Sequence, residues 1–346
     1  MGGLVIMGQQ RRKGGTVADR SEPKGIAGFL AKLGITALVI AFIVWRLGWR
    51  SIMSAFAQAD YAWVFLGFAL FVLSGILGSF QWRLLLHNKG IPMRFPRALM
   101  LYFVGMFFNN FVFGMIAGDA VKIALVRSSS GQGRAGFAAT FLDRFAGLLA
   151  MAVLALFGSA ILLKRGLVND GRTFTAVLAV AGTFALFCGV LSFVISRRVQ
   201  RMAFAVLEVL PLPSKPRIVG ILQKIVFEVH DRHMLAPIAG LSMLIQLMHI
   251  GVHILCAASL GLLSPANFQY FFIFVPILAM LMMIPLPFGI KEGIGGTLFM
   301  LAGFSPESPE APMVMEFLAS LVGIAASLVG GVLFVTGRLR KAQPRT

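Results

Sequence analysis

Long apolar runs dominate this chain and limit the folds open to it. About 20 apolar residues cross the hydrocarbon core of a bilayer, and runs of that length recur between short polar segments. Candidate spans occur at 26–45, 61–82, 98–117, 145–163, 173–195, 236–258, 268–284 and 313–336. With 58% hydrophobic and 13% charged residues, the composition excludes an ordinary soluble domain, which has about 25% charged residues. We predict an all-α polytopic integral membrane protein.

The positive charges lie between the apolar runs rather than in one dense patch. There are 31 Lys and Arg against 13 Asp and Glu, a net charge of +18. This distribution follows the positive-inside rule and does not indicate nucleic-acid binding. It favours attraction to an anionic membrane surface. We therefore expect a multi-pass protein of the cytoplasmic membrane. The basic segments expected on its cytoplasmic side, together with both termini, are 1–24, 83–97, 196–235 and 338–346.

Loop charges also predict how the chain is organised. The loops at 259–267 and 304–312 have no Lys or Arg, so we expect them outside. Each of the segments 97–144 and 262–310 then has both of its ends on the same side of the membrane. Each segment must cross the membrane an even number of times, or enter it and return to the side from which it came. We expect about six full transmembrane helices plus two broken or re-entrant helical hairpins. The basic loop at 164–172 would lie outside, against the rule.

These elements would form one flippase-like transmembrane domain over 26–337. A disordered basic tail at 1–25 would precede it, and a basic tail at 338–346 would follow. Within the domain, 196–235 alternates apolar and charged positions around the sequence PLPSKP. This pattern is typical of amphipathic helices lying in the membrane interface, here at the cytoplasmic face.

The first interruption of an apolar run lies between residues 105 and 144. Glycines at 114 and 118 break the run, and polar residues follow on both sides of a Gly/Ser loop. Polar groups at membrane depth need partners, so we predict a partly water-filled, charge-lined cavity. Its candidate substrate-binding residues are Asn109, Asn110, Asp119, Lys122, Arg127, Asp143 and Arg144.

Each candidate also has a structural interpretation. Asp119 is able to cap a helix that starts there, and the asparagines are able to hydrogen-bond between helices. Lys122 and Arg127 fit interfacial anchors whose long side chains reach the headgroups. The adjacent Asp143 and Arg144 fit either the start of a helix at the interface or a charge pair that lines or gates the cavity.

A second interruption, IPLPFGIKEGIGG, lies at 284–296. Its two prolines remove backbone donors, and Lys291 and Glu292 follow directly. A half-helix starting near Ile290 would direct its partially positive N-terminus at the cavity, as would one starting at Asp119. Helix N-termini with a lysine suit a phosphate. Two broken elements that meet from opposite membrane sides are typical of transporters.

Further polar residues lie inside apolar runs. Gln246, His249 and His253 share one helix face, which fits a packed polar seam or a proton-sensing role. No further ligand with zinc-site spacing accompanies them, so we expect no metal and no cofactor. Glu316, in the last apolar run, fits either a bundle seam or a site.

Four sequence pieces carry a family resemblance: FFNNF, AGDAVKIALVR, GFAATFLDRFAGLLA and IPLPFGIKEG. In this order they resemble the lysylphosphatidylglycerol-synthase transmembrane family, also called flippase-like membrane proteins, over about residues 30–336. The chain departs from the family pattern at Phe111-Val112-Phe113, where a proline is usual, and at Ala117, where a glycine is usual. Asp143 stands where Glu is common, and Lys291 where Arg is common. Lysine lacks the bidentate fork that arginine offers a phosphate.

The resemblance implies a lipid-related role. Some members carry a C-terminal aminoacyltransferase domain, whereas this chain ends shortly after its last apolar run. The resemblance therefore implies the lipid-translocating half and no enzyme. We expect a flippase or lipid-headgroup-binding transporter for a phospholipid or lipid-linked substrate. Two alternatives stay open. One is a membrane enzyme that transfers or modifies a headgroup with Asp or His as base. The other is a non-transporting accessory partner of a lipid-modifying enzyme, recruited through 196–235.

Overall fold

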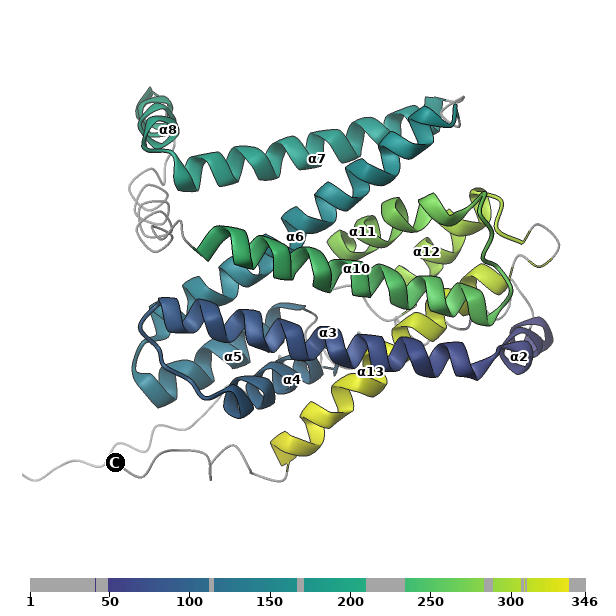
Figure 1. Cartoon of the computed structure of the whole chain (residues 1–346), viewed down its shortest axis with the longest axis horizontal. Coiled ribbons are helices and arrows are strands. Elements are labelled where there is room, and N and C mark those ends of the chain that lie inside the picture. Colours follow the sequence, from purple (N-terminus) through teal and green to yellow (C-terminus); the bar gives the residue numbers. More distant parts are fainter. Residues whose placement is uncertain are drawn as a thin grey trace, which may run out of the picture.

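The described residues form helices joined by short loops, with no strand among them (Figure 1). The computed structural model describes residues 41, 49–111, 115–166, 171–209, 234–282, 289–305, 308 and 310–335. The helices are α2 (Trp49–Gln58), α3 (Tyr61–Asn88), α4 (Phe95–Phe111), α5 (Met115–Ser130), α6 (Gly133–Lys164), α7 (Gly171–Ile195), α8 (Arg197–Val209), α10 (Leu235–Ser259), η2 (Phe268–Tyr270), α11 (Phe271–Leu281), α12 (Ile290–Leu301) and α13 (Ala311–Val335).

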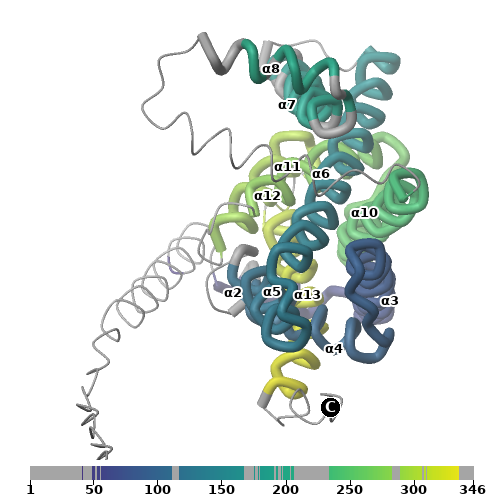
Figure 2. The backbone as a smooth tube through the Cα atoms, turned by 90° about the vertical axis from the view of Figure 1, so that its left-hand side faces the viewer, coloured from purple at the N-terminus to yellow at the C-terminus, as the bar shows by residue number. Residues whose placement is uncertain are grey.

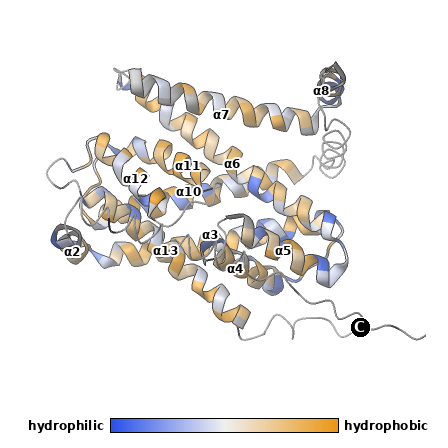
Figure 3. Ribbon diagram, turned by 180° about the vertical axis from the view of Figure 1, so that it is seen from behind, coloured by the Kyte–Doolittle hydropathy of each residue, from blue (hydrophilic) through white to orange (hydrophobic). Residues whose placement is uncertain are grey.

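Four of these helices, α3, α6, α10 and α13, are long and apolar enough to cross a bilayer. These helices expose large apolar side chains, and the hydropathy colouring of Figure 3 shows hydrophobic residues along much of their length. Phe65 of α3 is 71% exposed and Val332 of α13 is 63% exposed. Contiguous exposed apolar surface of this kind is unfavourable in water and favourable against lipid tails. The fold is therefore that of a multi-pass membrane protein.

Helices α3 and α10 lie side by side and run in opposite directions (Figure 1). The amide of Asp60, just before α3, donates to the carbonyl of Ser259 at the end of α10 over 2.8 Å. Near the other end of the pair, Ser242 donates to Gln81. This antiparallel pair forms the centre of the helix packing.

Two helical hairpins, α4–α5 and α11–α12, are each held between α6 and α13. Helix α4 packs on α13 and α5 on α6, whereas α11 packs on α6 and α12 on α13. The helices therefore form two similarly packed units, α3–α6 and α10–α13. Exchanging α3 with α10, α4 with α11, α5 with α12 and α6 with α13 reproduces the same set of packed helix pairs. Because α3 and α10 run in opposite directions, the two similarly packed units are inverted relative to each other.

Helices α7 and α8 stand outside this arrangement. Helix α7 packs on α6 and α8 packs on α7, on the side of the molecule away from α3 and α4 (Figure 2). Helix α8 lies in the predicted amphipathic segment 196–235 and confirms that the first part of this segment is helical. The predicted span 26–45, apart from residue 41, lies outside the described residues, as do the two tails and residues 210–233.

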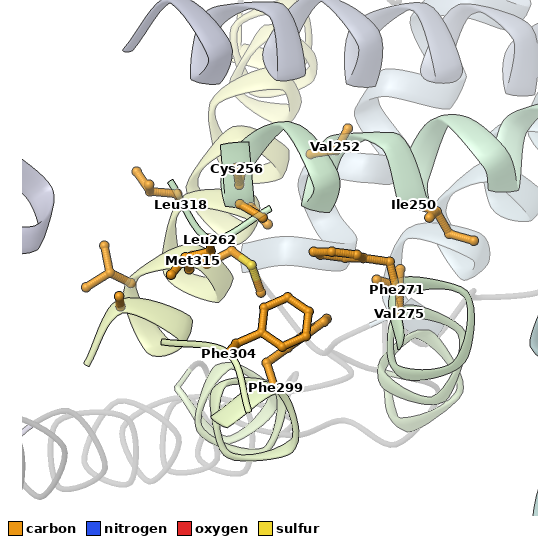
Figure 4. Close-up of a cluster of buried hydrophobic side chains, with 14 of the residues drawn as sticks. Ile250, Val252, Cys256, Leu262, Phe271, Val275, Phe299, Phe304, Met315 and Leu318 are labelled. Carbon is orange, nitrogen blue, oxygen red and sulfur yellow. The ribbon is translucent and has the colours of Figure 1, made fainter. Parts of the chain in front are cut away.

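The largest apolar cluster fills the second unit. Phe271 of α11, Phe299 of α12, Met315 of α13 and Cys256 of α10 are buried against one another and against Phe304 (Figure 4). Aromatic rings supply much of the contact, with the Phe299 and Phe304 centroids 4.9 Å apart. Cys256 is thus a packed thiol.

Two predicted helix boundaries are wrong. Helix α5 begins at Met115, so Gly118 and Asp119 lie inside its first turns rather than at its start. Helix α6 begins at Gly133, which places Asp143 and Arg144 well within the helix and not at its opening. The second interruption agrees with the prediction, because α12 begins at Ile290. The residue before it, Gly289, has a φ of 97°, a conformation that glycine adopts without strain.

Candidate functional site

The first charged cluster forms where α5 meets α6. Asp119 accepts two hydrogen bonds from the Arg144 guanidinium, from Nε to Oδ2 over 2.7 Å and from Nη2 to Oδ1 over 2.9 Å. The Nζ of Lys122 lies 3.0 Å from the same Oδ1. Forked, charge-assisted pairs of this kind are the strong ones. The Arg144 side chain is 32% exposed and that of Asp119 is 18% exposed, so this pair is the accessible part of the cluster.

Lys122 is buried and is not an interfacial anchor. Its side chain is 2% exposed, and its Nζ lies 5.3 Å from the ring centroid of Trp82 and 4.9 Å from that of Tyr102. Aromatic faces attract a cation when water is excluded. Together with Asp119 they explain how a lysine is tolerated at this depth. Arg127, in contrast, is exposed near the end of α5, where it fits an anchor.

The two arms of the first hairpin touch through their backbones. The amide of Gly118 donates to Oδ1 of Asn109 over 2.8 Å. A Cβ at Gly118 would overlap the carbonyl oxygen of Gly105 and the Asn109 side chain. Asn109 thus joins α4 to α5, the structural alternative considered above, whereas Asn110 is exposed at the end of α4.

Asn109→Ala is expected to lower the free energy of unfolding by about 1–3 kcal/mol, because it leaves the Gly118 amide without its acceptor. Thermal unfolding of the detergent-solubilised protein measures the effect. Asn110→Ala is the matched control, since an exposed substitution usually changes stability by less than about 0.5 kcal/mol. Equal losses from both variants would contradict the role given to Asn109.

Asp143 and Arg144 do not pair with each other. Asp143 is 6% exposed and accepts a hydrogen bond from Nε2 of Gln81 over 2.9 Å. The side-chain oxygen of Gln81, Oε1, accepts from the hydroxyl of Ser242. Arg144 points instead to Asp119 across α5. The adjacent residues therefore connect α6 to two different neighbours, α3 and α5.

A second charged cluster forms where α12 meets α13. Glu292 accepts from the amide of Gly289 over 2.7 Å and so caps its own helix. It also accepts from the hydroxyl of Ser320, and Nζ of Lys291 donates to the same Ser320 oxygen over 2.8 Å. Glu292 is 3% exposed. The predicted residues Lys291 and Glu292 therefore lie together, in a cluster separate from the one around Asp119.

Glu316 completes the second cluster. It is fully buried on α13, with Oε2 3.7 Å from Nε2 of His253 and 3.9 Å from Nζ of Lys291. Among the described residues, neither carboxyl oxygen of Glu316 has a hydrogen-bond partner.

A polar seam along α10 runs between the two clusters. His249 hydrogen-bonds through Nδ1 to Gln246 and through Nε2 to Ser74, each over 3.1 Å. His253 contacts the carbonyl of His249. This packing agrees with the seam interpretation of Gln246, His249 and His253. Within the described part of the chain, no three His, Cys, Asp or Glu side chains come together as a metal site would require.

The acidic residues of the two clusters occupy equivalent places in the two units. Asp119 corresponds to Glu292 in the second arm of each hairpin, and Asp143 corresponds to Glu316 in the helix that follows. Both pairs have the same separation along the sequence. That constant spacing is the signal that places Glu316 with the other candidates. No comparable spacing in the sequence indicates the contacts that Gln81, Trp82, Tyr102 and Ser320 make with the charged residues.

The sequence of this chain matches known proteins over most of its length. Residues 29–330 match the family described as lysylphosphatidylglycerol synthase TM region. The chain belongs to this family. A UPF0104 membrane protein of Methanothermobacter thermautotrophicus is 25% identical over 313 residues, which cover 85% of this chain and 89% of that protein. A UPF0104 membrane protein of Pyrococcus horikoshii is 24% identical over 124 residues, covering 35% of this chain and 36% of that protein. The family resemblance inferred from the four sequence pieces is therefore confirmed.

Proposed function

We propose that this family member binds the phosphate-bearing headgroup of a phospholipid or lipid-linked substrate and moves it between the leaflets of the cell membrane. The observation that carries the proposal is the partly exposed Arg144–Asp119 pair, set between membrane-length apolar helices. An arginine fork recognises a phosphate as well as a carboxylate. An arriving headgroup would therefore replace Asp119 as the partner of Arg144.

Helix lengths support a re-entrant arrangement for the hairpins. At 1.5 Å per residue, α11 and α12 are about 17 and 18 Å long, against about 30 Å for the hydrocarbon core. Helices α4 and α5, with 17 and 16 residues, reach about 25 Å. We therefore retain six full spans and two hairpins that enter and return, one in each inverted unit. The carboxylates Asp119 and Glu292 belong to these two hairpins.

Helix α8 fits an anionic cytoplasmic leaflet. Arg198 and Arg201 are exposed on α8 beside Met202, which is 70% exposed. Basic and apolar residues together on a short helix favour binding in a charged membrane interface. We place α8 and both termini on the cytoplasmic side, where a lipid-modifying enzyme would also have access.

An Asp119→Asn, Glu292→Gln double variant tests the proposal. We expect headgroup movement in liposomes to slow by about tenfold or more, since the loss of one hydrogen bond to a charged group costs about 1.5–3 kcal/mol. Vesicles with labelled anionic and zwitterionic lipids and an impermeant quencher give the rate. Glu310→Gln, which removes a carboxylate in the loop before α13, is the matched control. Equal rates for wild type and the double variant would overturn the proposal.

A further inference from the structure

Among the described residues, none supplies the hydrogen that a contact between His253 and Glu316 needs. The Nδ1 of His253 lies 3.1 Å from the backbone carbonyl of His249. A carbonyl oxygen only accepts, so Nδ1 must carry the hydrogen. In a neutral imidazole the other nitrogen, Nε2, is then a bare acceptor. That bare nitrogen faces Oε2 of Glu316 at 3.7 Å, which places two acceptors opposite each other.

The first unit shows how the same position is satisfied without titration. There Gln81 of α3, the helix that corresponds to α10, donates through its amide to Asp143, the counterpart of Glu316. A glutamine always has hydrogens to donate. For His253 to make the equivalent contact with Glu316, a proton must enter between Nε2 and Oε2.

The charges of the two clusters also indicate a proton at the His253–Glu316 pair. The first cluster contains Lys122 and Arg144 against two aspartates and is neutral. Among the described residues, the second contains one cation, Lys291, against Glu292 and Glu316, and so has one uncompensated negative charge when His253 is neutral. An isolated charge at membrane depth is costly. A single added proton removes the excess.

We propose that His253 and Glu316 bind one exchangeable proton, shared between Nε2 and the carboxylate, and that this proton is a coupling ion for the proposed transport. The coupling part rests on the proposed function, whereas proton binding does not. Lys291 and Ser320 connect the pair to Glu292. Loading the proton therefore changes the balance of charge around the start of α12, the second arm of the re-entrant hairpin.

Within the described residues, the other ionisable groups near the pair come from α10 and α12. His249 and Cys256 lie on α10 itself, and Lys291 and Glu292 come from α12. Helix α11 has no ionisable side chain, and the seam residue that α3 brings to His249 is Ser74. Tyr102 of α4 and Arg144 of α6 belong to the first cluster. Glu316 is fully buried, and its neighbours on α13, Met315 and Leu318, belong to the apolar cluster of Figure 4.

Spectroscopy on the purified full-length protein tests proton binding directly. We expect infrared difference spectra of the Glu316 carboxyl and ring-nitrogen NMR of His253 to change together in one step as the pH is varied. His253→Gln and Glu316→Gln should each abolish the joint step. Glu310→Gln and His87→Gln, which alter side chains outside the pair, should leave it intact. Independent changes, or no change, at the two residues in wild type would overturn the proposal even if a variant failed to fold.

A transport measurement tests the coupling. In liposomes with an imposed pH gradient, wild-type lipid movement should depend on the direction of the gradient. Glu316→Gln and His253→Gln should lose that dependence. A wild-type protein that moves lipid at a rate independent of the gradient would overturn the coupling. If no lipid moves under any condition, the proposed function fails, and the spectroscopic step still decides whether the pair binds a proton.

Discussion

Arg144→Lys is expected to slow headgroup movement by about tenfold, and Arg144→Gln by about a hundredfold. Lysine keeps the charge but loses the two-pronged geometry that matches a phosphate. One hydrogen bond to a charged group contributes about 1.5–3 kcal/mol, and about 1.4 kcal/mol corresponds to a factor of ten. Glutamine loses the charge as well. The liposome assay with labelled phospholipid, at equal amounts of folded protein, measures both rates.

A second substitution separates recognition from folding in this experiment. Arg144→Gln leaves Asp119 with Lys122 as its remaining charged partner, and part of its effect will be lost stability. The double variant Asp119→Asn, Arg144→Gln removes both charges of the pair. We expect it to regain stability relative to Arg144→Gln and to remain inactive. Recovery of lipid movement in the double variant would show that Arg144 serves only to neutralise Asp119.

Gly118→Ala is expected to give the largest loss of stability among single-methyl additions to the first hairpin. Its Cβ would overlap the backbone carbonyl of Gly105, which cannot move aside as a flexible side chain does. Overpacking costs about 1–3 kcal/mol and sometimes more, and here the hydrogen bond to Asn109 is also displaced. Thermal unfolding in detergent measures the change, and easier proteolysis between α4 and α5 should accompany it.

Gly240→Ala is the control for this prediction. Gly240 lies in α10, and a Cβ there would meet nothing within 4 Å. Alanine has a helix propensity about 1 kcal/mol better than that of glycine, so this variant should be neutral or more stable than wild type. Similar destabilisation by the two substitutions would mean that the close approach of α4 and α5 does not limit stability.

The sequence was informative where the chemistry is local. Prolines and glycines predicted the second interruption and the start of α12 at Ile290, because these residues alter the backbone wherever they occur. Helical spacing placed Gln246, His249 and His253 on one face, which the seam along α10 confirms. At the first interruption the prediction was displaced, because α5 begins at Met115 rather than at Asp119. No capping signal in the sequence marks that start.

Contacts between distant segments were beyond sequence reasoning. Lys122 resembles an interfacial anchor until the rings of Trp82 and Tyr102, from two other helices, are seen to enclose it. The separation of the charged residues into two clusters follows from the way each hairpin packs against both α6 and α13. No local pattern contains that information. A comparison of the chain with itself would have paired Asp119 with Glu292 and Asp143 with Glu316.

For the transport that we propose, the antiparallel pairing of α3 and α10 has a consequence for how substrate would reach either leaflet. Two units of similar packing and opposite direction have interchangeable roles. A conformation in which the first unit is closed and the second is relaxed would have a counterpart with these two states exchanged. The counterpart would open to the other face of the bilayer. One rocking motion about the central helix pair then suffices to expose the same headgroup to each side in turn, without a separate gate for each.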